Sequence, residues 1–330
     1  MLKKHFPKIF PLFKRNAKKE KIRYEITPEI EKFWTEEKKK WDNFMEKRAI
    51  NMPFKNSENE TSELKTIPLR TASSNFNKAL RVNFQPALVK DDVIPEVKVT
   101  NFPKEYVLPK INIGMLVNQD FNIERFDDII DSNTSNTNDI RTFINLLHNT
   151  VQKRLVSGNA NNYSLVNNLL HISKLDTKPF NIKIRSDCKL FAGDDLYETI
   201  YPELLILNQN KCPTMIVVGK HLNNVDKDFE ETRIAAEILS CGDKNRRRTH
   251  EDSDQTIFAI RLISTYVTFY KAVITTPYWK ELNYGLPLKH SVLIKRWPGK
   301  NGLRTGLDIT DPNGRKEVLL ALAKIRQFNS

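Results

Sequence analysis

The sequence has few of the residues that build disulfide frameworks and zinc sites. Three cysteines occur in 330 residues, and none lies in a CxxC pair. An odd, scattered set of this kind argues against a disulfide framework or a zinc site and favours a reducing compartment. The six histidines show no HExxH or other metal-binding spacing. These absences turn attention to oxygen ligands from acidic residues.

Long apolar runs and nucleotide-binding motifs are also missing. No run approaches the length of about 20 residues that a membrane-spanning helix needs, so we expect no transmembrane segment and no membrane partner. Neither GxxxxGK[ST] nor GxGxxG occurs, which argues against the usual nucleoside triphosphatases and dinucleotide enzymes. We find no nucleophile elbow or assignable catalytic triad. The remaining composition, 39% hydrophobic and 28% charged, is typical of a globular protein with disordered additions.

Positive charge is concentrated at the N-terminus. The chain has 53 basic and 40 acidic residues, and nine of the basic residues but only two acidic ones lie in residues 1–25. This segment is predicted to be a basic arm that contacts nucleic acid or import machinery, or else a mitochondrial presequence. Pro7 and Pro11 would interrupt a presequence helix. We therefore expect an intracellular protein, in nucleus or cytoplasm rather than mitochondrion, without a secretory signal.

The region before the main domain divides into two parts. Residues 26–50 are predicted to contain an amphipathic helix over 28–48, whose apolar face carries Trp34 and Trp41 at helical spacing. This face either packs against its own domain or docks on a protein partner. Residues 51–135 lack periodicity and are rich in Asn, Ser, Thr and Pro, which predicts an irregular linker.

Residues 136–330 carry the periodic patterns of a mixed α/β, or α+β, domain. Helices are predicted over 140–155, 164–175 and 228–241, with Gly242 as a stop for the third, and from Pro312 onward. Alternating apolar residues predict strands at 180–192, twice within 201–220, at 256–275 with a break near Ser264, and at 291–297. The first three strands form an antiparallel meander.

The stretch "YPELLILNQNKCPTMIVVGK", residues 201–220, is the candidate site. A turn near residues 209–211 pairs Glu203 with Val218, and Lys220 lies on the same face two residues later. A carboxylate and a lysine then meet at one end of the sheet. Metal-dependent nucleases need such a pair plus a second carboxylate, since two carboxylates hold Mg²⁺, the metal activates water, and the lysine stabilises developing charge.

The second carboxylate is missing from the hairpin, where Val218 and Gly219 stand instead. The following helix could supply it, which makes Glu230, Glu231 and Glu237 candidate metal ligands beside Glu203. Asp194 and Asp195 in the preceding turn are further candidates. Besides Glu203 and Lys220, the candidate catalytic residues are Glu231 and His221. Alternatively, Glu203 and Lys220 form an ion pair at the strand ends.

Residues 180–328 resemble a group of uncharacterised fungal proteins with a PD-(D/E)xK nuclease-like domain. The segments that carry the resemblance are "PELLILNQNKCPTMIVVGKHL", "IAAEILSCGDKN", "QTIFAIRLISTYVTFYKAVIT", "YWKELNYGLP", "SVLIKRWPG" and "GLDITDPNGRKEVLLALAKIRQF". The resemblance implies a restriction-endonuclease-like core, with Mg²⁺ as cofactor if the site is active. Two departures stand in the site: "VVGK" has no acid before Lys220, and Thr232 and Arg233 replace a glutamine expected early in the next helix.

Two basic groups are candidate nucleic-acid contacts. The segment "NRRRTH", residues 245–250, contains Arg246, Arg247 and Arg248, which could meet phosphates or form a solvated loop. Lys271 lies among Tyr266, Phe269 and Tyr270, aromatic residues that could stack on bases or pack in the core.

Three functions follow from these residues. We expect a nuclease-like protein that has lost catalysis and retains DNA, RNA or protein binding. The first alternative is an active Mg²⁺-dependent endonuclease whose second carboxylate has migrated to the helix after Lys220. The second alternative is an interaction protein that docks through the helix at 28–48. The position of the helix carboxylates relative to Glu203 discriminates the first two functions.

Overall fold

A computed structural model describes residues 73–118, 121, 137–156, 163–193, 195–220, 227–302 and 304–330. Within these ranges the side chains of 73–75, 153–156, 195–198, 220 and 227–230 are not described. By its internal contacts the chain divides into residues 1–60 and 61–330, and every described residue belongs to the second unit. The predicted basic arm and the helix predicted at 28–48 therefore lie outside the described residues.

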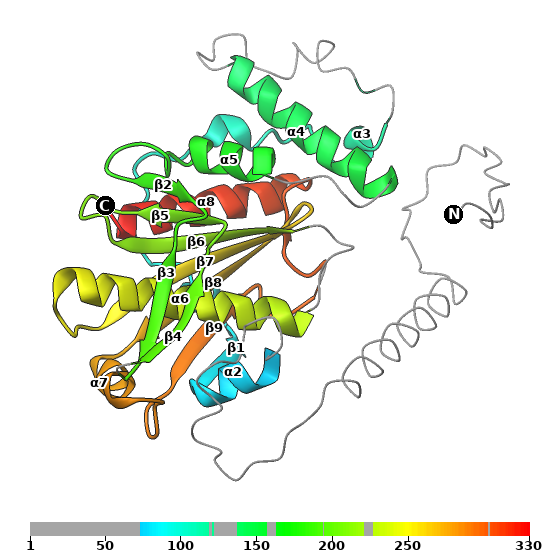
Figure 1. The fold of residues 1–330 in the computed structure, drawn as a ribbon. Coiled ribbons are helices and arrows are strands. Elements are labelled where there is room, and N and C mark those ends of the chain that lie inside the picture. Colours follow the sequence, from blue (N-terminus) through cyan, green and yellow to red (C-terminus); the bar gives the residue numbers. More distant parts are fainter. Residues whose placement is uncertain are drawn as a thin grey trace, which may run out of the picture. The chain divides into compact units, whose positions relative to one another are not determined.

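A mixed sheet forms the centre of the described unit (Figure 1). Its strands follow the order β1 (Val82–Pro86), β9 (Val292–Trp297), β8 (Tyr266–Ile274), β7 (Gln255–Ile263), β6 (Pro213–Lys220), β5 (Leu204–Leu207) and β2 (Asn181–Ile184), with β10 (Leu307–Asp308) paired to β8. The β1–β9 and β6–β7 pairs are parallel, and the other pairs are antiparallel. A separate two-stranded sheet pairs β3 (Cys188–Ala192) with β4 (Asp195–Ile200). The predicted mixed α/β class is confirmed.

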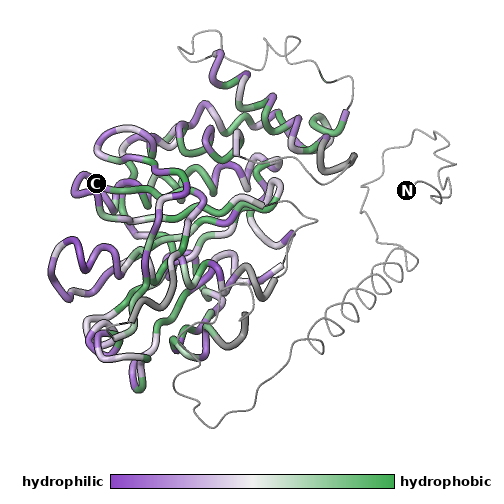
Figure 2. Tube along the Cα trace, viewed as in Figure 1, coloured by the Kyte–Doolittle hydropathy of each residue, from purple (hydrophilic) through white to green (hydrophobic). Residues whose placement is uncertain are grey.

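Helices cover both faces of this sheet and create two apolar cores. One core contains side chains from α4 (Thr137–Val156), α5 (Tyr163–Ile172) and α8 (Pro312–Phe328), and from the segment around η2 (Lys90–Asp92), η3 (Lys104–Tyr106) and α3 (Ile113–Leu116). The other contains side chains from α2 (Ser73–Ala79), α6 (Lys227–Thr249), α7 (Thr276–Tyr284), β3 and β4. Figure 2 shows hydrophobic residues along the central strands and hydrophilic ones in the outer loops. Among the described helices, none is both long and apolar enough to cross a membrane.

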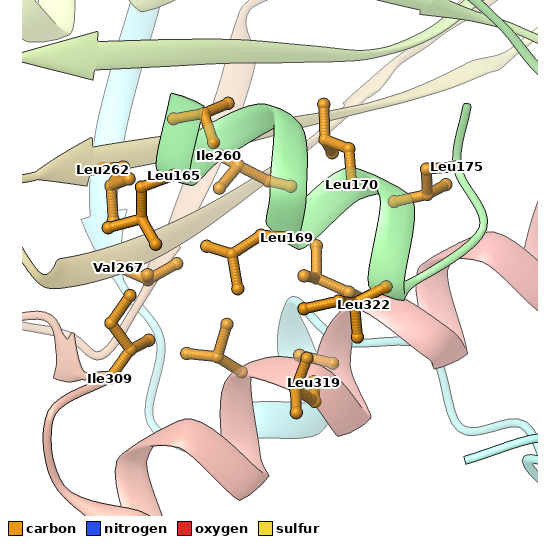
Figure 3. Close-up of a cluster of buried hydrophobic side chains, with 14 of the residues drawn as sticks. Leu165, Leu169, Leu170, Leu175, Ile260, Leu262, Val267, Ile309, Leu319 and Leu322 are labelled. Carbon is orange, nitrogen blue, oxygen red and sulfur yellow. The ribbon is translucent and has the colours of Figure 1, made fainter. Parts of the chain in front are cut away.

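Aliphatic side chains make up the part of the core between α5, α8 and the sheet that Figure 3 labels. Leu165 of α5 lies beside Leu262 of β7, and Leu169 of α5 points toward α8, which contributes Leu319 and Leu322. Apolar residues three and four positions apart share one helix face, so each helix presents a stripe to the other. This layer fixes the sheet from the face opposite α6.

Local signals set several element boundaries as predicted. The Asp311 carboxylate accepts a hydrogen bond from the Gly314 backbone N–H at 2.8 Å and caps α8, whose first residue is Pro312. Ser264 has φ of 56° in the tight turn between β7 and β8, which splits the long β-rich run. The predictions of a helix at Pro312 and a break near Ser264 are confirmed.

Two other predictions were wrong. The single strand predicted at 180–192 is two strands in different sheets, with Arg185 at φ 47° just after β2, and β4 was not expected. The helix predicted to stop at Gly242 continues to residue 249. A Cβ at Gly242 would lie 2.7 Å from the Trp279 ring, so the glycine allows close helix packing rather than ending the helix.

The irregular linker predicted at 51–135 is also corrected in its described part. Within it, β1 pairs in parallel with β9 and extends the central sheet. Buried side chains in this part include Leu80, Ile94, Ile111 and Leu116, each at most 2% exposed. These buried side chains are isolated residues in short elements, so no periodic sequence pattern predicted their burial. The folded unit therefore begins well before residue 136.

Candidate functional site

The hairpin of β5 and β6 places Glu203 as its register predicts. Leu204 pairs with Val217, and continuation of this antiparallel register sets Glu203 opposite Val218. On its other side Val218 pairs with Arg261 of the parallel strand β7. Val218 lies in the same core as Ile234 of α6, so α6 covers the face of the sheet to which Val218 points. The first turns of α6, the end of β6 and the residue before β5 thus meet at one end of the sheet.

A guanidinium lies between two carboxylates at this place. Arg233 Nη2 is 3.2 Å from Glu203 Oε1, and Arg233 Nε donates to Glu237 Oε1 at 2.8 Å. Glu203 Oε2 accepts a hydrogen bond from the Gly219 backbone N–H at 3.0 Å. Glu237 is completely buried, and Glu203 and Arg233 are 15% and 19% exposed. The structure therefore brings Glu203 and Glu237 to the same cation, and that cation is an arginine.

The neighbouring acid of α6 takes a different partner. Glu231 forms an ion pair with Arg296 at the end of β9, and Arg296 also donates from Nε and Nη2 to the Gly299 carbonyl at 3.2 and 3.0 Å. Both side chains are largely buried, at 15% and 8% exposure. Glu231 thus holds the start of α6 against β9. Of the described candidate ligands, Glu237 rather than Glu231 lies beside the cation that contacts Glu203.

The described residues do not fit a magnesium site. Mg²⁺ takes oxygen ligands in a near-octahedral shell, whereas the carboxylates of Glu203 and Glu237 already contact one guanidinium. In the described part of the chain, no group of three or more His, Cys, Asp and Glu side chains is arranged to hold a metal ion. The side chains of Glu230 and Lys220 and the residues His221 and Asp194 lie outside the described positions, as does the side chain of Asp195.

The predicted nucleic-acid contacts of α6 lie at the helix's far end. Arg246 and Arg247 both contact Asp243, at 2.6 and 2.8 Å, and Arg246 also lies 3.4 Å from Asp252. Arg248 Nε donates to the Asn210 carbonyl at 3.0 Å. These three arginines therefore have structural partners at the C-terminus of α6, away from Glu203, and their contact with nucleic acid stays a prediction.

Lys271 lies on the other face of the sheet. It pairs with Phe258 and Lys295 in β7 and β9. Its neighbour Tyr270 belongs to the core that α6 covers, and consecutive strand residues face opposite sides. Phe269 and Tyr270 are fully buried, so the packing interpretation of these aromatic residues is confirmed. Lys271 is separated from Glu203 by the sheet.

No protein-family model and no curated protein sequence matches this chain.

The candidate site also contains residues that the sequence of the hairpin did not predict. The sequence analysis noted Arg233 only because it replaces an expected glutamine. Its spacing from Glu237, however, is the i,i+4 spacing of a helical ion pair. Arg261 is an arginine within an apolar strand, which is an uncommon residue for a buried position. An arginine within an apolar strand was therefore a sequence signal that could have identified Arg261 as a candidate site residue.

Proposed function

We propose that this chain is a nuclease-like protein with a restriction-endonuclease-like core, that its catalytic centre is degenerate, and that it retains binding of nucleic acid or protein. The topology supports the core assignment. Strands β2, β5 and β6 are antiparallel neighbours, with the separate β3–β4 pair inserted between β2 and β5 in the chain; α6 follows β6, and β7 then lies parallel to β6. Apart from the inserted β3–β4 pair, this order supports the proposed core of three antiparallel strands, a helix and further strands.

The observation that carries the loss of catalysis is the position of Arg233 between Glu203 and Glu237. A divalent metal held by two carboxylates polarises a phosphate and lowers the pKa of its bound water. A guanidinium carries one positive charge where the metal carries two, and it stays protonated and coordinates no water as a Lewis acid. In this arrangement the two carboxylates keep a cationic partner, while the chemistry of a metal centre is lost.

One observation favours an active Mg²⁺-dependent endonuclease as the second candidate. Glu237 stands on the helix after Lys220 and reaches the guanidinium that Glu203 contacts. A migrated second carboxylate would take this place. The active enzyme would require the Arg233 side chain to leave its position between the two carboxylates.

Cleavage assays with labelled single- and double-stranded DNA and RNA test the proposal. The purified full chain, Glu203→Ala and Lys220→Ala would each be incubated with Mg²⁺, Mn²⁺ or EDTA. We expect no metal-dependent cleavage by any of the three. Metal-dependent cleavage by the wild type that both substitutions abolish would overturn the degenerate centre and support the second candidate. Gel shifts of the same substrates then decide between a nucleic-acid and a protein partner.

A further inference from the structure

A cavity lies at the C-terminal ends of α5 and α8, on the face of the sheet opposite α6. Its walls come from residues 99–106 around η3, the first turn of α4, the turn after α5 and the C-terminal turns of α8. Its volume is about 600 Å³, within the range of about 300–1,000 Å³ that is usual for small-molecule sites. Thr100 and Lys174 in its wall are exposed, so a ligand can enter without a movement of the chain.

Two cations of the wall, Lys174 and Arg326, lack a counter-ion and are called the cationic pair below. Arg326 Nε donates to the Lys174 carbonyl at 3.1 Å, and the guanidinium carbon lies 5.9 Å from the centre of the Phe180 ring. These contacts position the guanidinium, while its Nη1 and Nη2 form no hydrogen bond within the described part of the chain. Asp176, near Lys174 in the chain, accepts instead from His171 Nδ1 at 2.8 Å. The two Nη groups can therefore bind the oxygens of a carboxylate.

Two carboxylates of the wall, Glu105 and Asp139, form the acidic pair. Both lie near Tyr106, because burial and then the charges of Asp139 and Glu105 raise the pKa of Tyr106 to about 12. The Tyr106 hydroxyl stays protonated at neutral pH, and among the described residues it has no hydrogen-bond partner. Neither acid forms an ion pair with a described cation, so the acidic and cationic pairs do not neutralise each other. The acidic pair suits an ammonium group.

Ser173 is an independent indication of a ligand. It lines the cavity and is 5% exposed, and its Oγ has no hydrogen-bond partner. A buried polar group without a partner is unfavourable and uncommon in folded proteins. Phe102 and Ile172 add apolar surface to the same walls. The cavity thus combines apolar surface, hydroxyl groups available for hydrogen bonds, and separate positive and negative groups.

We propose that this cavity binds a free peptide of two to four residues, with its terminal carboxylate at the cationic pair and its terminal ammonium at the acidic pair. A single amino acid carries both charges on one carbon, whereas an extended peptide separates its termini by about 3.3–3.6 Å per residue. A sphere of the cavity's volume is about 10 Å across, the length of about three extended residues. The hydroxyl groups of Ser173 and Tyr106 donate to the peptide. The site goes beyond the proposed nuclease-like function, since Glu203 lies on the α6 side of the sheet.

Isothermal titration calorimetry of the full chain with trialanine tests both ends of the site. The comparison peptides are N-acetyltrialanine, which lacks the ammonium group, and trialanine amide, which lacks the carboxylate. Hydrogen bonds to charged groups contribute more than neutral ones, so wild type should bind each blocked peptide at least about tenfold more weakly than trialanine. No binding of trialanine, or equal affinity for all three peptides, would overturn the site.

Two substitutions assign the ends of the peptide. Arg326→Gln should weaken trialanine binding about tenfold or more and leave the affinity for trialanine amide at the wild-type value, because the amide has no carboxylate for the guanidinium. Glu105→Gln should weaken trialanine binding and leave that of N-acetyltrialanine unchanged. Lys280→Gln is the matched control, since it removes an exposed cation from α7 on the α6 side of the sheet and should change no affinity.

Thermal unfolding shows whether each variant is folded before its titration is interpreted. Unchanged trialanine affinity in a folded Arg326→Gln or Glu105→Gln would contradict the proposal. The same holds for an equal loss in Lys280→Gln, which would indicate attraction by the overall charge of the protein instead of a site.

Discussion

Replacement of Arg233 by alanine should destabilise the domain by about 3 kcal/mol at neutral pH. Removal of one member of a buried ion pair costs roughly 3–5 kcal/mol, because the other charge stays behind without its partner. The lower end applies here, since Glu203 and Arg233 keep 15% and 19% exposure while Glu237 has none. For a domain of this size the melting temperature should fall by about 6–12 °C.

A double-mutant cycle with Glu237→Gln tests the cause of that loss. Urea unfolding followed by circular dichroism gives the free energy of unfolding for wild type, each single variant and the pair. In the Glu237→Gln background the cost of Arg233→Ala should fall to about 1 kcal/mol, since the buried carboxylate is gone. A cost below about 1 kcal/mol in both backgrounds would refute the view that Arg233 is the counter-charge of the site.

The same variant tests whether the guanidinium occupies a cation position. In Arg233→Ala the carboxylates of Glu203 and Glu237 no longer share an arginine, and a divalent ion prefers such oxygen ligands. We expect Mn²⁺ to raise the melting temperature of Arg233→Ala more than that of wild type. An equal shift in the two proteins would argue against this view of the site.

Three further substitutions test the packing and electrostatics around the site. Gly242→Ala should destabilise by about 1–3 kcal/mol in urea unfolding, because a Cβ there lies 2.7 Å from the Trp279 ring. Arg315→Met should cost at least about 3 kcal/mol in the same assay, since four buried carbonyls lose a charged donor. Desolvation opposes ionisation of Glu281, but hydrogen bonds from the backbone N–H groups of 288–290 lower its pKa to about 2. The contribution of the Glu281 carboxylate to folding stability is therefore fully present above the unfolded pKa of about 4.3 and is lost as pH falls toward 2. Glu281→Gln should remove this pH dependence of the melting temperature.

Short-range chemistry explains which parts of the fold could be predicted from the sequence. The turn after β5 fixes the pairing of Leu204 with Val217, so the place of Glu203 opposite Val218 followed from local spacing. The cap at Asp311 is equally local. Gly242 was misjudged because a glycine in a helix signals either a stop or a close packing partner, and Trp279, the partner that decides, lies on another helix.

The chemistry of the site depended on contacts that no local pattern encodes. The Arg233–Glu237 pair was accessible from its spacing along α6. The contact of Arg233 with Glu203 joins a helix to a strand end 30 positions earlier and required the packing of α6 on the sheet. The same holds for Glu231 and Arg296, 65 positions apart. Spacing alone thus identified candidate acids but could not assign their partners.

These contacts also bear on whether an acid introduced at position 218 could help to build a metal centre. Val218 is fully buried, opposite Glu203 on one side and paired with Arg261 on the other. A carboxylate at position 218 would lie at the end of the sheet that already contains the guanidinium of Arg233 and that of Arg261, whose Nε and Nη2 have no hydrogen-bond partner. Either arginine would compete with a metal ion for that carboxylate. A metal centre at this end of the sheet would therefore require changes at positions 218, 233 and 261 together.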